Sequence, residues 1–223
     1  MKYDNEDLYK QLRCPVGAEA RQVGESMFQS NSNMIFKTID ILEILPNTKV
    51  LEIGFGNGMH LSYIFEKECL LMYEGIDISK AMVDEATLNN YELVKLGKVA
   101  FKHITESDIL CFTDSSFDYC FSVNTLYFWD NPQKYIDEIY RVLQDGGKIA
   151  ITFISKSFGE MLPFTKKGFV FYEIEDIELF LNKSGFCNVQ SILLAEDAIS
   201  KDGQRVERPF FIVTAIKCNK FIY

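Results

Sequence analysis

The chain has 223 residues, which suits one medium-sized domain with a substantial hydrophobic core. Hydrophobic residues make up 48% and charged residues 25% of the sequence, as in an ordinary globular protein. The formal net charge of -9 argues against a protein that binds the phosphate backbone of nucleic acids, because such proteins present clustered lysines and arginines.

Targeting and metal-binding signals are weak in this sequence. Residues 1–7 are charged and polar, unlike the apolar region of a secretory signal, and apolar runs such as 149–154 are far shorter than a membrane span. We therefore expect a cytoplasmic protein. The six cysteines lie far apart without a Cys-x-x-Cys pair, so we expect reduced, structural thiols, with a structural zinc site as the alternative. No cluster of His, Cys or acidic residues has metal-ligand spacing, so we expect no metal.

From about residue 49, short apolar runs alternate with stretches whose apolar residues recur every three or four positions. This alternation predicts an α/β fold in which helices cover a parallel sheet. The runs expected to form its strands are 49–53, 73–78, 99–104, 117–123 and 148–154. The stretches expected to form helices are 59–68, 80–90, 133–143 and 175–184, with Ser79 as a cap and Asp145-Gly146-Gly147 as a tight turn.

Two further strand-like runs, 188–195 and 209–217, end the sequence and are joined by a polar loop containing Asp202-Gly203. They predict a C-terminal antiparallel hairpin. We expect a single domain over residues 1–223. It comprises an N-terminal helical cap (1–47, with a helix at 33–45), a core (48–155), and a last part (156–223) with a lid, the last helix and the hairpin.

The first predicted strand runs directly into a glycine-rich turn, Glu52-Ile-Gly-Phe-Gly-Asn-Gly58. Glycines at such a turn allow the backbone to approach a ligand closely, although a tight turn without a ligand is the alternative. A dinucleotide fingerprint would need its third glycine at position 59, which is Met59, whereas here Gly58 follows Gly56 by two residues. This spacing, and the absence of a Tyr-x-x-x-Lys pair after the fourth strand, disfavours a nicotinamide-dependent oxidoreductase.

An acidic residue, Asp77, follows the glycine turn by about 20 residues in the segment Gly75-Ile-Asp-Ile-Ser79. A carboxylate at the end of the second strand can accept hydrogen bonds from the ribose hydroxyls of a bound nucleoside. The alternative is that Asp77 only caps the helix that begins near Ser79. The spacing from Gly58 favours the ligand role.

With these two motifs, the sequence resembles the class I S-adenosylmethionine-dependent methyltransferases, specifically the small methyltransferase-domain type related to ubiquinone and menaquinone biosynthesis enzymes. The resemblance covers about residues 50–217, with 106–109, 117–127 and 141–147 matching later segments of the family and the terminal hairpin fitting as well. It implies a Rossmann-like fold, a doubly wound, mostly parallel seven-stranded sheet. It also implies that S-adenosyl-L-methionine is the cofactor and S-adenosyl-L-homocysteine the product.

The resemblance also implies roles for individual residues. Glu52 would organise the amino-acid end of the cofactor, Asp77 would accept from its ribose, and Asp108 with Ile109 would select the edge of adenine. The backbone near Asn124 would hold the methionyl amine. The full set expected to bind the cofactor is Glu52, Gly54, Gly56, Gly58, Asp77, Ile78, Met82, Asp108, Ile109 and Asn124.

The acceptor end of the site is less defined by the sequence. Methyl transfer from a sulfonium is an in-line displacement that mainly needs alignment and exclusion of water, so a general base is not required. Residues 124–130 lack the Asn/Asp-Pro-Pro-Tyr/Phe motif of enzymes that methylate nucleic-acid amino groups. We therefore expect a small-molecule acceptor and no nucleic-acid partner. The candidates for the acceptor pocket are Tyr127, Tyr172 and His60.

Each of these candidates has an alternative. One of the adjacent aromatics around Tyr127 is expected to pack into the core, and a lone histidine such as His60 often faces solvent or contacts a neighbour. Residues 160–172 look like a substrate lid, or else a short helix that closes the core. Residues 13–24 fit a shaped loop over the cofactor. A non-catalytic member of the fold remains the alternative function.

Overall fold

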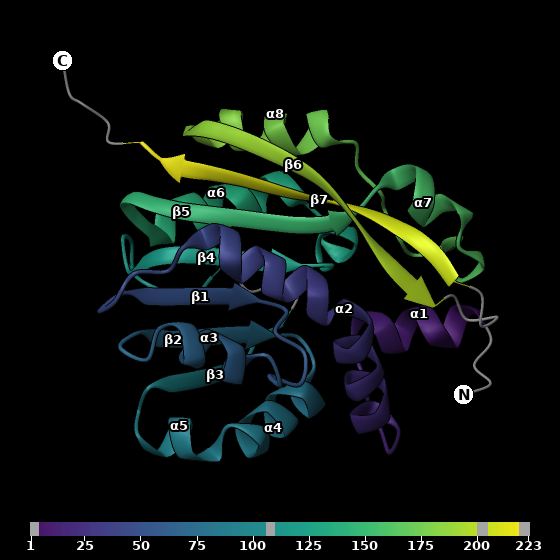
Figure 1. Ribbon diagram of the computed structural model, residues 1–223, viewed down its shortest axis with the longest axis horizontal. Helices are drawn as coiled ribbons and strands as arrows, with labels where there is room; N and C mark the ends of the chain where they lie inside the picture. The colour runs from purple at the N-terminus through teal and green to yellow at the C-terminus, as the bar shows by residue number, and fades with distance from the viewer. Residues whose placement is uncertain (1–4, 106–109, 200–204, 219–223) are drawn as a thin grey trace.

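A computed structural model describes residues 5–105, 110–199 and 205–218 of the protein. Its centre is a seven-stranded sheet with the order β3-β2-β1-β4-β5-β7-β6 (Figure 1). The pairs from β3 through β5 are parallel, and β7 is antiparallel to both β5 and β6. The expected doubly wound, mostly parallel sheet with a C-terminal antiparallel hairpin is therefore confirmed.

The strands follow the apolar runs of the sequence closely. Burial explains the agreement, since β1 and β4 are almost wholly buried and parallel strands covered on both faces need continuous apolar runs. Their bounds are β1 Lys49–Ile53, β2 Met72–Asp77, β3 Val99–His103, β4 Phe117–Val123, β5 Leu143–Ile154, β6 Phe186–Ile199 and β7 Arg205–Lys217.

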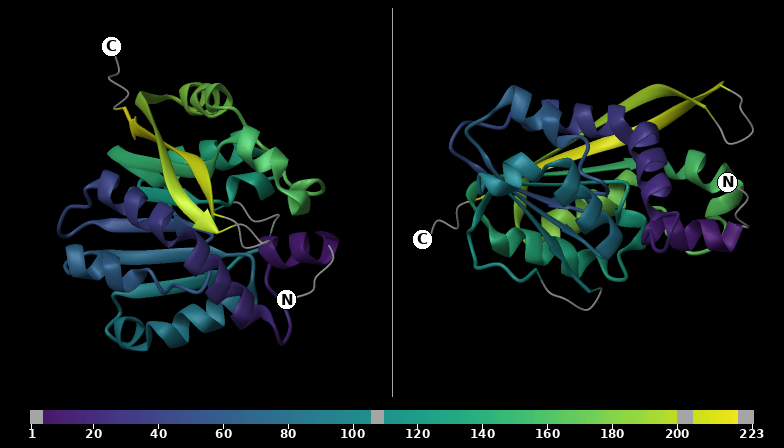
Figure 2. Two further views of the ribbon diagram at one scale, coloured as in Figure 1. Left: turned by 45° about the vertical axis from the view of Figure 1, so that its right-hand side comes forward. Right: turned by 90° about the horizontal axis from the view of Figure 1, so that it is seen from below.

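Helices cover both faces of the sheet. Figure 2 shows α2 along one face and α6 with α8 on the other, so that the sheet is enclosed between two helical layers. The expected cap by Ser79 is present, because its side chain accepts a hydrogen bond from the Met82 backbone nitrogen. The helices are α1 Asn5–Arg13, α2 Ala20–Leu42, α3 Leu61–Lys67, α4 Lys80–Asn89, α5 Tyr91–Lys95, α6 Pro132–Val142, α7 Lys156–Met161 and α8 Ile174–Ser184, with 3-10 turns η1 Leu126–Phe128 and η2 Pro163–Thr165.

The N-terminal region contains more helix than the sequence predicted. Helix α2 is 23 residues long and starts well before the expected 33–45, and α1 was not expected. Gly24, assigned to a loop from the sequence, lies inside α2. A Cβ at Gly24 would come within 2.9 Å of the Met82 sulfur, so the glycine allows α2 to pack closely against the Met82 side chain of α4 and does not form a turn.

The last strands are longer than predicted. Strand β5 begins at Leu143, and its pairing shifts between Phe117↔Leu143 and Tyr119↔Lys148. The extra residues of β5 lie around Gly146, which has a φ of 82°, so the expected turn falls on an irregular stretch inside a longer strand. Strands β6 and β7 pair with each other from Phe186 onward, whereas β5 pairs only with residues 210–216 of β7. Residues 196–199 of β6 and 205–208 of β7, which pair with each other, therefore extend past β5 (Figure 2).

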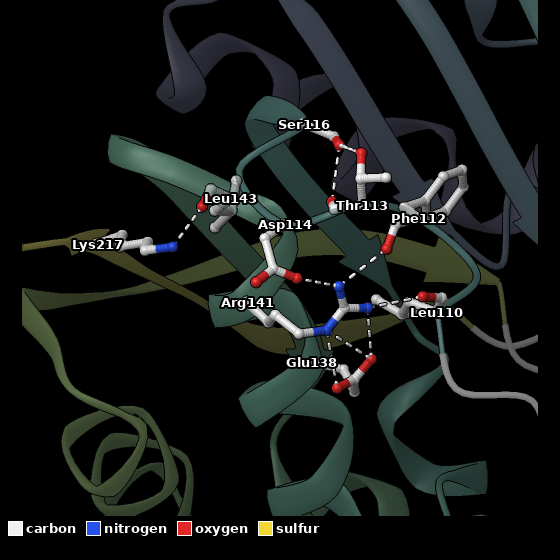
Figure 3. A network of polar contacts seen from close by, with 9 residues as sticks. All are labelled: Leu110, Phe112, Thr113, Asp114, Ser116, Glu138, Arg141, Leu143 and Lys217. Atoms are coloured by element: carbon white, nitrogen blue, oxygen red, sulfur yellow. Dashed lines mark hydrogen bonds and ion pairs between the residues drawn. The ribbon is translucent and has the colours of Figure 1, made fainter.

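A single guanidinium joins α6 to the segment before β4 (Figure 3). Arg141 donates to the carbonyl oxygens of Leu110 and Phe112, each at 2.8 Å. It also forms ion pairs with Asp114 at 2.7 Å and Glu138 at 2.8 Å. Charge-assisted bonds of this kind are among the stronger polar contacts in proteins, so Arg141 fixes the described end of the connection from β3 to β4.

The cysteines correct one expectation. Cys187 and Cys218 form a disulfide with their Cα atoms 5.8 Å apart, while Cys14, Cys69, Cys111 and Cys120 remain thiols. The pairing was not visible in the sequence because 31 residues separate the two cysteines. Antiparallel pairing of β6 with β7 brings them together. Across the ranges that the structure describes, no helix is long and apolar enough to cross a membrane, and no cluster of potential metal ligands is found.

Candidate active site

A large cavity lies at the carboxyl ends of β1, β2 and β4, where ligands bind in doubly wound sheets. It contains about 1130 Å³ of space between atoms, part of it open to solvent. The residues that line it are Leu12, Arg13, Pro15, Gly24, Met27, Phe28, Asn31, Ile35, Glu52, Ile53, Gly54, Phe55, Gly56, Asn57, His60, Ile76, Asp77, Ile78, Met82, Ile104, Val123, Asn124, Thr125, Phe128, Trp129, Asp130 and Tyr135.

The three glycines of the turn have different surroundings, although all three have a positive φ. A Cβ at Gly54 would lie 2.2 Å from the Thr125 side chain, and a Cβ at Gly58 would lie 2.9 Å from Ala86. Gly56 has nothing within 4 Å of that position and lines the cavity. Gly58 does not line the cavity, and the absence of a side chain there allows close packing on α4.

Asp77 ends β2 with its carboxylate buried and facing the cavity. One oxygen accepts from the Ser79 backbone nitrogen at 2.8 Å and the other from Gly56 at 3.2 Å. Asp77 therefore does accept from the backbone at the start of α4, as the capping alternative predicted. The same residue also lines the cavity. Burial raises the pKa of Asp77 to about 6, because the two backbone bonds offset the desolvation of the carboxylate only in part.

Glu52 and His60 form a buried pair beside the turn. The Glu52 carboxylate lies 2.6 Å from the His60 Nε2 atom and 2.5 Å from the Tyr73 hydroxyl. Glu52 and His60 both line the cavity. Of the two alternatives for His60, contact with a neighbour is confirmed, since it contacts Glu52. The solvent-facing alternative is wrong because the side chain is buried.

The remaining cofactor candidates lie at two edges of the cavity. Ile78 and Met82 line it on the side of α4. Asn124 lines it after β4, with a φ of 57° and a backbone nitrogen that donates to Thr152. Asp108 and Ile109 lie outside the described residues.

The two tyrosine candidates do not line the cavity. The Tyr127 hydroxyl donates to the Asn124 side chain at 2.8 Å and accepts from the Ile154 backbone nitrogen at 2.6 Å, so it is engaged in the core. Tyr172 packs against Phe180. Residues 160–172 likewise do not line the cavity, and Phe169 packs against Tyr127. This segment therefore packs on the core, as the second of its two alternatives predicted, and does not lie over the cavity as a lid would.

Besides Phe55 in the glycine turn, the aromatic residues that line the cavity are Phe28, Phe128, Trp129 and Tyr135. Trp129 and Tyr135 stack with their ring centres 4.9 Å apart. Except for Trp129 and Phe128, which adjoin Tyr127, the sequence analysis missed them, because Phe28 and Tyr135 lie on helices far from the glycine turn. Tyr135 lies in the predicted helix 133–143, where its position was indistinguishable from a core position, and Phe28 precedes the predicted helix 33–45.

Charged side chains also line this aromatic side of the cavity. Arg13, at the end of α1, lies 3.7 Å from Asp130 in an ion pair. The other carboxylates at the cavity are Glu52 and Asp77. Among the described lining residues Arg13 is the one Lys or Arg side chain, so negative charge prevails at the site.

The residues present suit an adenosyl cofactor. Gly56 leaves open space where its backbone faces the cavity, and the buried Asp77 carboxylate retains acceptor capacity beyond its two backbone bonds. A ligand whose hydroxyls donate to this carboxylate would offset its desolvation. Ile78 and Met82 supply the apolar surface that a purine ring needs.

Comparisons with known proteins identify the family. The "Methyltransferase domain" family matches residues 51–151. The chain is 31% identical to "Uncharacterized methyltransferase YdaC" of Bacillus subtilis, a match covering 70% of this chain and 87% of that protein. It is also 31% identical to "Phosphoethanolamine N-methyltransferase 2" of Caenorhabditis elegans over 66% of this chain, but this chain spans only 34% of that enzyme.

Solved structures share the fold. A Haemonchus contortus phosphoethanolamine N-methyltransferase 2 in complex with phosphomonomethylethanolamine and S-adenosylhomocysteine has a TM-score of 0.71 at 16% identity, covering 98% of this chain and 61% of that one. A Haloferax volcanii methyltransferase in complex with the Trm112 activator also has a TM-score of 0.71, at 15% identity, covering 90% of this chain and 95% of that one. The chain therefore belongs to the class I S-adenosylmethionine-dependent methyltransferases.

Proposed function

We propose that the protein transfers a methyl group from S-adenosylmethionine to a small-molecule acceptor by in-line displacement. The observation that carries the proposal is the placement of Gly56 and Asp77 on one cavity, with open space at the glycine and a buried acceptor at the carboxylate. The cofactor supplies a methyl group on a positively charged sulfur, which needs no further activation as a leaving group.

The protein's part is then to hold both reactants and to exclude water. Asp77 and the backbone at Gly56 hold the adenosyl part, while Asn124 lies at the methionine end. Leu12 of α1 and Met27 of α2 line the cavity from the N-terminal region and cover the site with apolar surface. Geometry of this kind accounts for methyl transfer without a general base.

The aromatic side of the cavity favours an acceptor that is neutral or cationic. Three carboxylates line the cavity and its one Lys or Arg side chain among the described residues, Arg13, is within ion-pair distance of Asp130. On the aromatic side Arg13 is paired with Asp130, so the described lining offers no net positive charge to a phosphate ester, whereas an amine or a neutral ring can lie against Phe128 and Tyr135. This proposal differs from the phosphate-bearing acceptors named for the nematode relatives.

Calorimetric titration tests the cofactor part of the proposal. We expect micromolar binding of S-adenosylmethionine and S-adenosylhomocysteine to the purified chain, and no saturation by NADH. Binding of NADH in preference to both adenosyl ligands would contradict the proposal.

Methyl transfer itself is tested with cofactor labelled in the methyl group and a metabolite extract. Labelled products are then separated by charge. We expect label in the neutral or cation-exchange fraction. Label retained mainly by anion exchange would contradict the acceptor class, and cofactor binding without any labelled product would favour the non-catalytic alternative.

A further inference from the structure

Two donors converge on one oxygen of a buried carboxylate at the cavity. Glu52 is 2% exposed, and its Oε2 atom accepts from the Tyr73 hydroxyl at 2.5 Å and from the His60 Nε2 atom at 2.6 Å. Within the described part of the chain, both contacts of this carboxylate fall on Oε2. Since Glu52 lines the cavity, Oε1 is the oxygen that remains for a ligand.

The strand β2 is shaped to allow this arrangement. Gly75 pairs with Glu52 in the β1–β2 register, and Tyr73 lies two residues earlier on the same face of β2. A Cβ at Gly75 would lie 3.0 Å from the Tyr73 hydroxyl and 2.6 Å from the Phe55 ring. The absence of a side chain at Gly75 therefore leaves room for the Tyr73 hydroxyl to reach the Glu52 carboxylate.

The hydroxyl of Tyr73 stays a donor. Burial raises the pKa of Tyr73 well above its usual range, and the nearby negative charge of Glu52 raises it further. One donor alone does not fix a glutamate, because its terminal torsion is broad. A second donor on the same oxygen, from the start of α3 rather than from β2, restricts the carboxylate plane.

We propose that His60 is a positioning residue for the cofactor. It holds the Glu52 carboxylate so that Oε1 faces the α-ammonium group at the amino-acid end of S-adenosylmethionine. This inference rests on the proposed function. It predicts that His60 affects binding of the amino-acid part of the ligand and leaves binding of the adenosyl part unchanged.

A pair of ligands isolates this effect. S-adenosylhomocysteine carries the amino-acid end, whereas 5′-methylthioadenosine carries the same adenosyl thioether without it. In calorimetric titrations of His60→Leu, we expect S-adenosylhomocysteine to bind at least about tenfold more weakly and methylthioadenosine to bind within about twofold of the unchanged chain.

Conservative variants separate positioning from folding. His60→Gln retains a donor nitrogen of similar reach and should recover S-adenosylhomocysteine affinity to within about threefold, whereas the shorter His60→Asn should behave as His60→Leu. Tyr73→Phe removes the other donor to the same oxygen. It should also weaken binding of S-adenosylhomocysteine and not of methylthioadenosine, but by a smaller factor than His60→Leu does. Melting curves without ligand identify any variant that fails to fold, in which case the Gln and Asn pair decides.

Two outcomes would overturn the inference. One is equal weakening of both ligands by His60→Leu, which indicates a general collapse of the cavity. The other is unchanged binding of S-adenosylhomocysteine in both His60→Leu and His60→Asn. Failure of the unchanged chain to bind either ligand would instead contradict the proposed function, so the two failures are distinguishable.

Discussion

The cofactor half and the acceptor half of the cavity are built in different ways. The cofactor half comes from the ends of β1 and β2, where buried polar groups such as Glu52 and Asp77 are each fixed by two hydrogen bonds. The acceptor half comes from α1, α2 and residues 123–135, and its walls are mainly apolar and aromatic. The positions of the polar groups in the cofactor half are thus set by the sheet. The shape of the acceptor half is set by helices and a loop.

The largest effect should come from Asp77. Asp77→Asn removes the charge that accepts the ribose hydroxyls, and hydrogen bonds to charged groups contribute about 1.5–3 kcal/mol. We expect S-adenosylhomocysteine to bind about 100-fold more weakly in calorimetry. Asp84→Asn, on the exposed face of α4, is the matched control and should change affinity less than about twofold. Equal affinities for the two variants would remove Asp77 from the site.

Two glycines of the same turn should separate binding from stability. Gly56→Ala places a methyl group in the cavity with about 1 kcal/mol of backbone strain, so affinity should fall about tenfold or more with little change in melting temperature. Gly58→Ala crowds Ala86 and Asn90, and should lower the free energy of unfolding by about 2–3 kcal/mol. Its cofactor affinity, measured well below the melting temperature, should change much less.

If Gly58→Ala instead weakened binding more than Gly56→Ala, the assignment of the two glycines would be reversed. Both variants have a positive φ at the substituted position, so backbone strain is common to the pair. The difference in affinity and stability between the two variants therefore depends on the surroundings of the added methyl group.

The pH dependence of cofactor binding should follow the Asp77 carboxyl, whose pKa is about 6. Ribose hydroxyls donate to the ionised form, so affinity should fall as pH decreases through 6 and be about tenfold weaker at pH 5 than at pH 7. Stability without ligand should change in the opposite direction. Because the folded state holds this proton to higher pH than the unfolded state does, its contribution to stability is present below pH 3.8 and is lost as pH rises from there through about 6.

Titrations across pH 5–8 measure both trends. Asp77→Asn should abolish this part of the affinity profile, since no proton is exchanged at position 77. A profile that persists unchanged in Asp77→Asn would assign the titration to another group.

The sequence predicted the cofactor half better than the acceptor half for a physical reason. Glu52, Gly56 and Asp77 lie at strand ends that a parallel sheet brings to one edge, so their spacing along the chain carries the geometry. Phe28 on α2 and Tyr135 on α6 come from helices that cover opposite faces of the sheet, and no local pattern in the sequence specifies that both line one cavity. Tyr127 is a pocket candidate from the sequence because it lies in the loop after the fourth strand, where the family that the sequence resembles binds its acceptor, but its hydroxyl bonds within the core.

The same limit explains the errors elsewhere in the fold. Strand β5 begins earlier than the predicted 148–154 because Leu143 pairs with Phe117 ahead of the irregular stretch at Gly146, and only pairing with β4 decides this start. The Cys187–Cys218 disulfide depends on the register of the hairpin, which the sequence did not specify.

The smallest expected effect concerns the acceptor half. Tyr135→Leu keeps an apolar side chain but removes the ring that stacks on Trp129, so the aromatic wall loses its shape and its capacity to attract a cation. We expect kcat/KM for the acceptor found in the labelling assay to fall about three- to tenfold, while S-adenosylhomocysteine affinity stays within about twofold. Tyr172→Leu, outside the cavity, is the matched control and should leave both values nearly unchanged. If Tyr172→Leu reduced kcat/KM as much as Tyr135→Leu, the acceptor would bind nearer to α8 and the division of the cavity into two halves would be wrong.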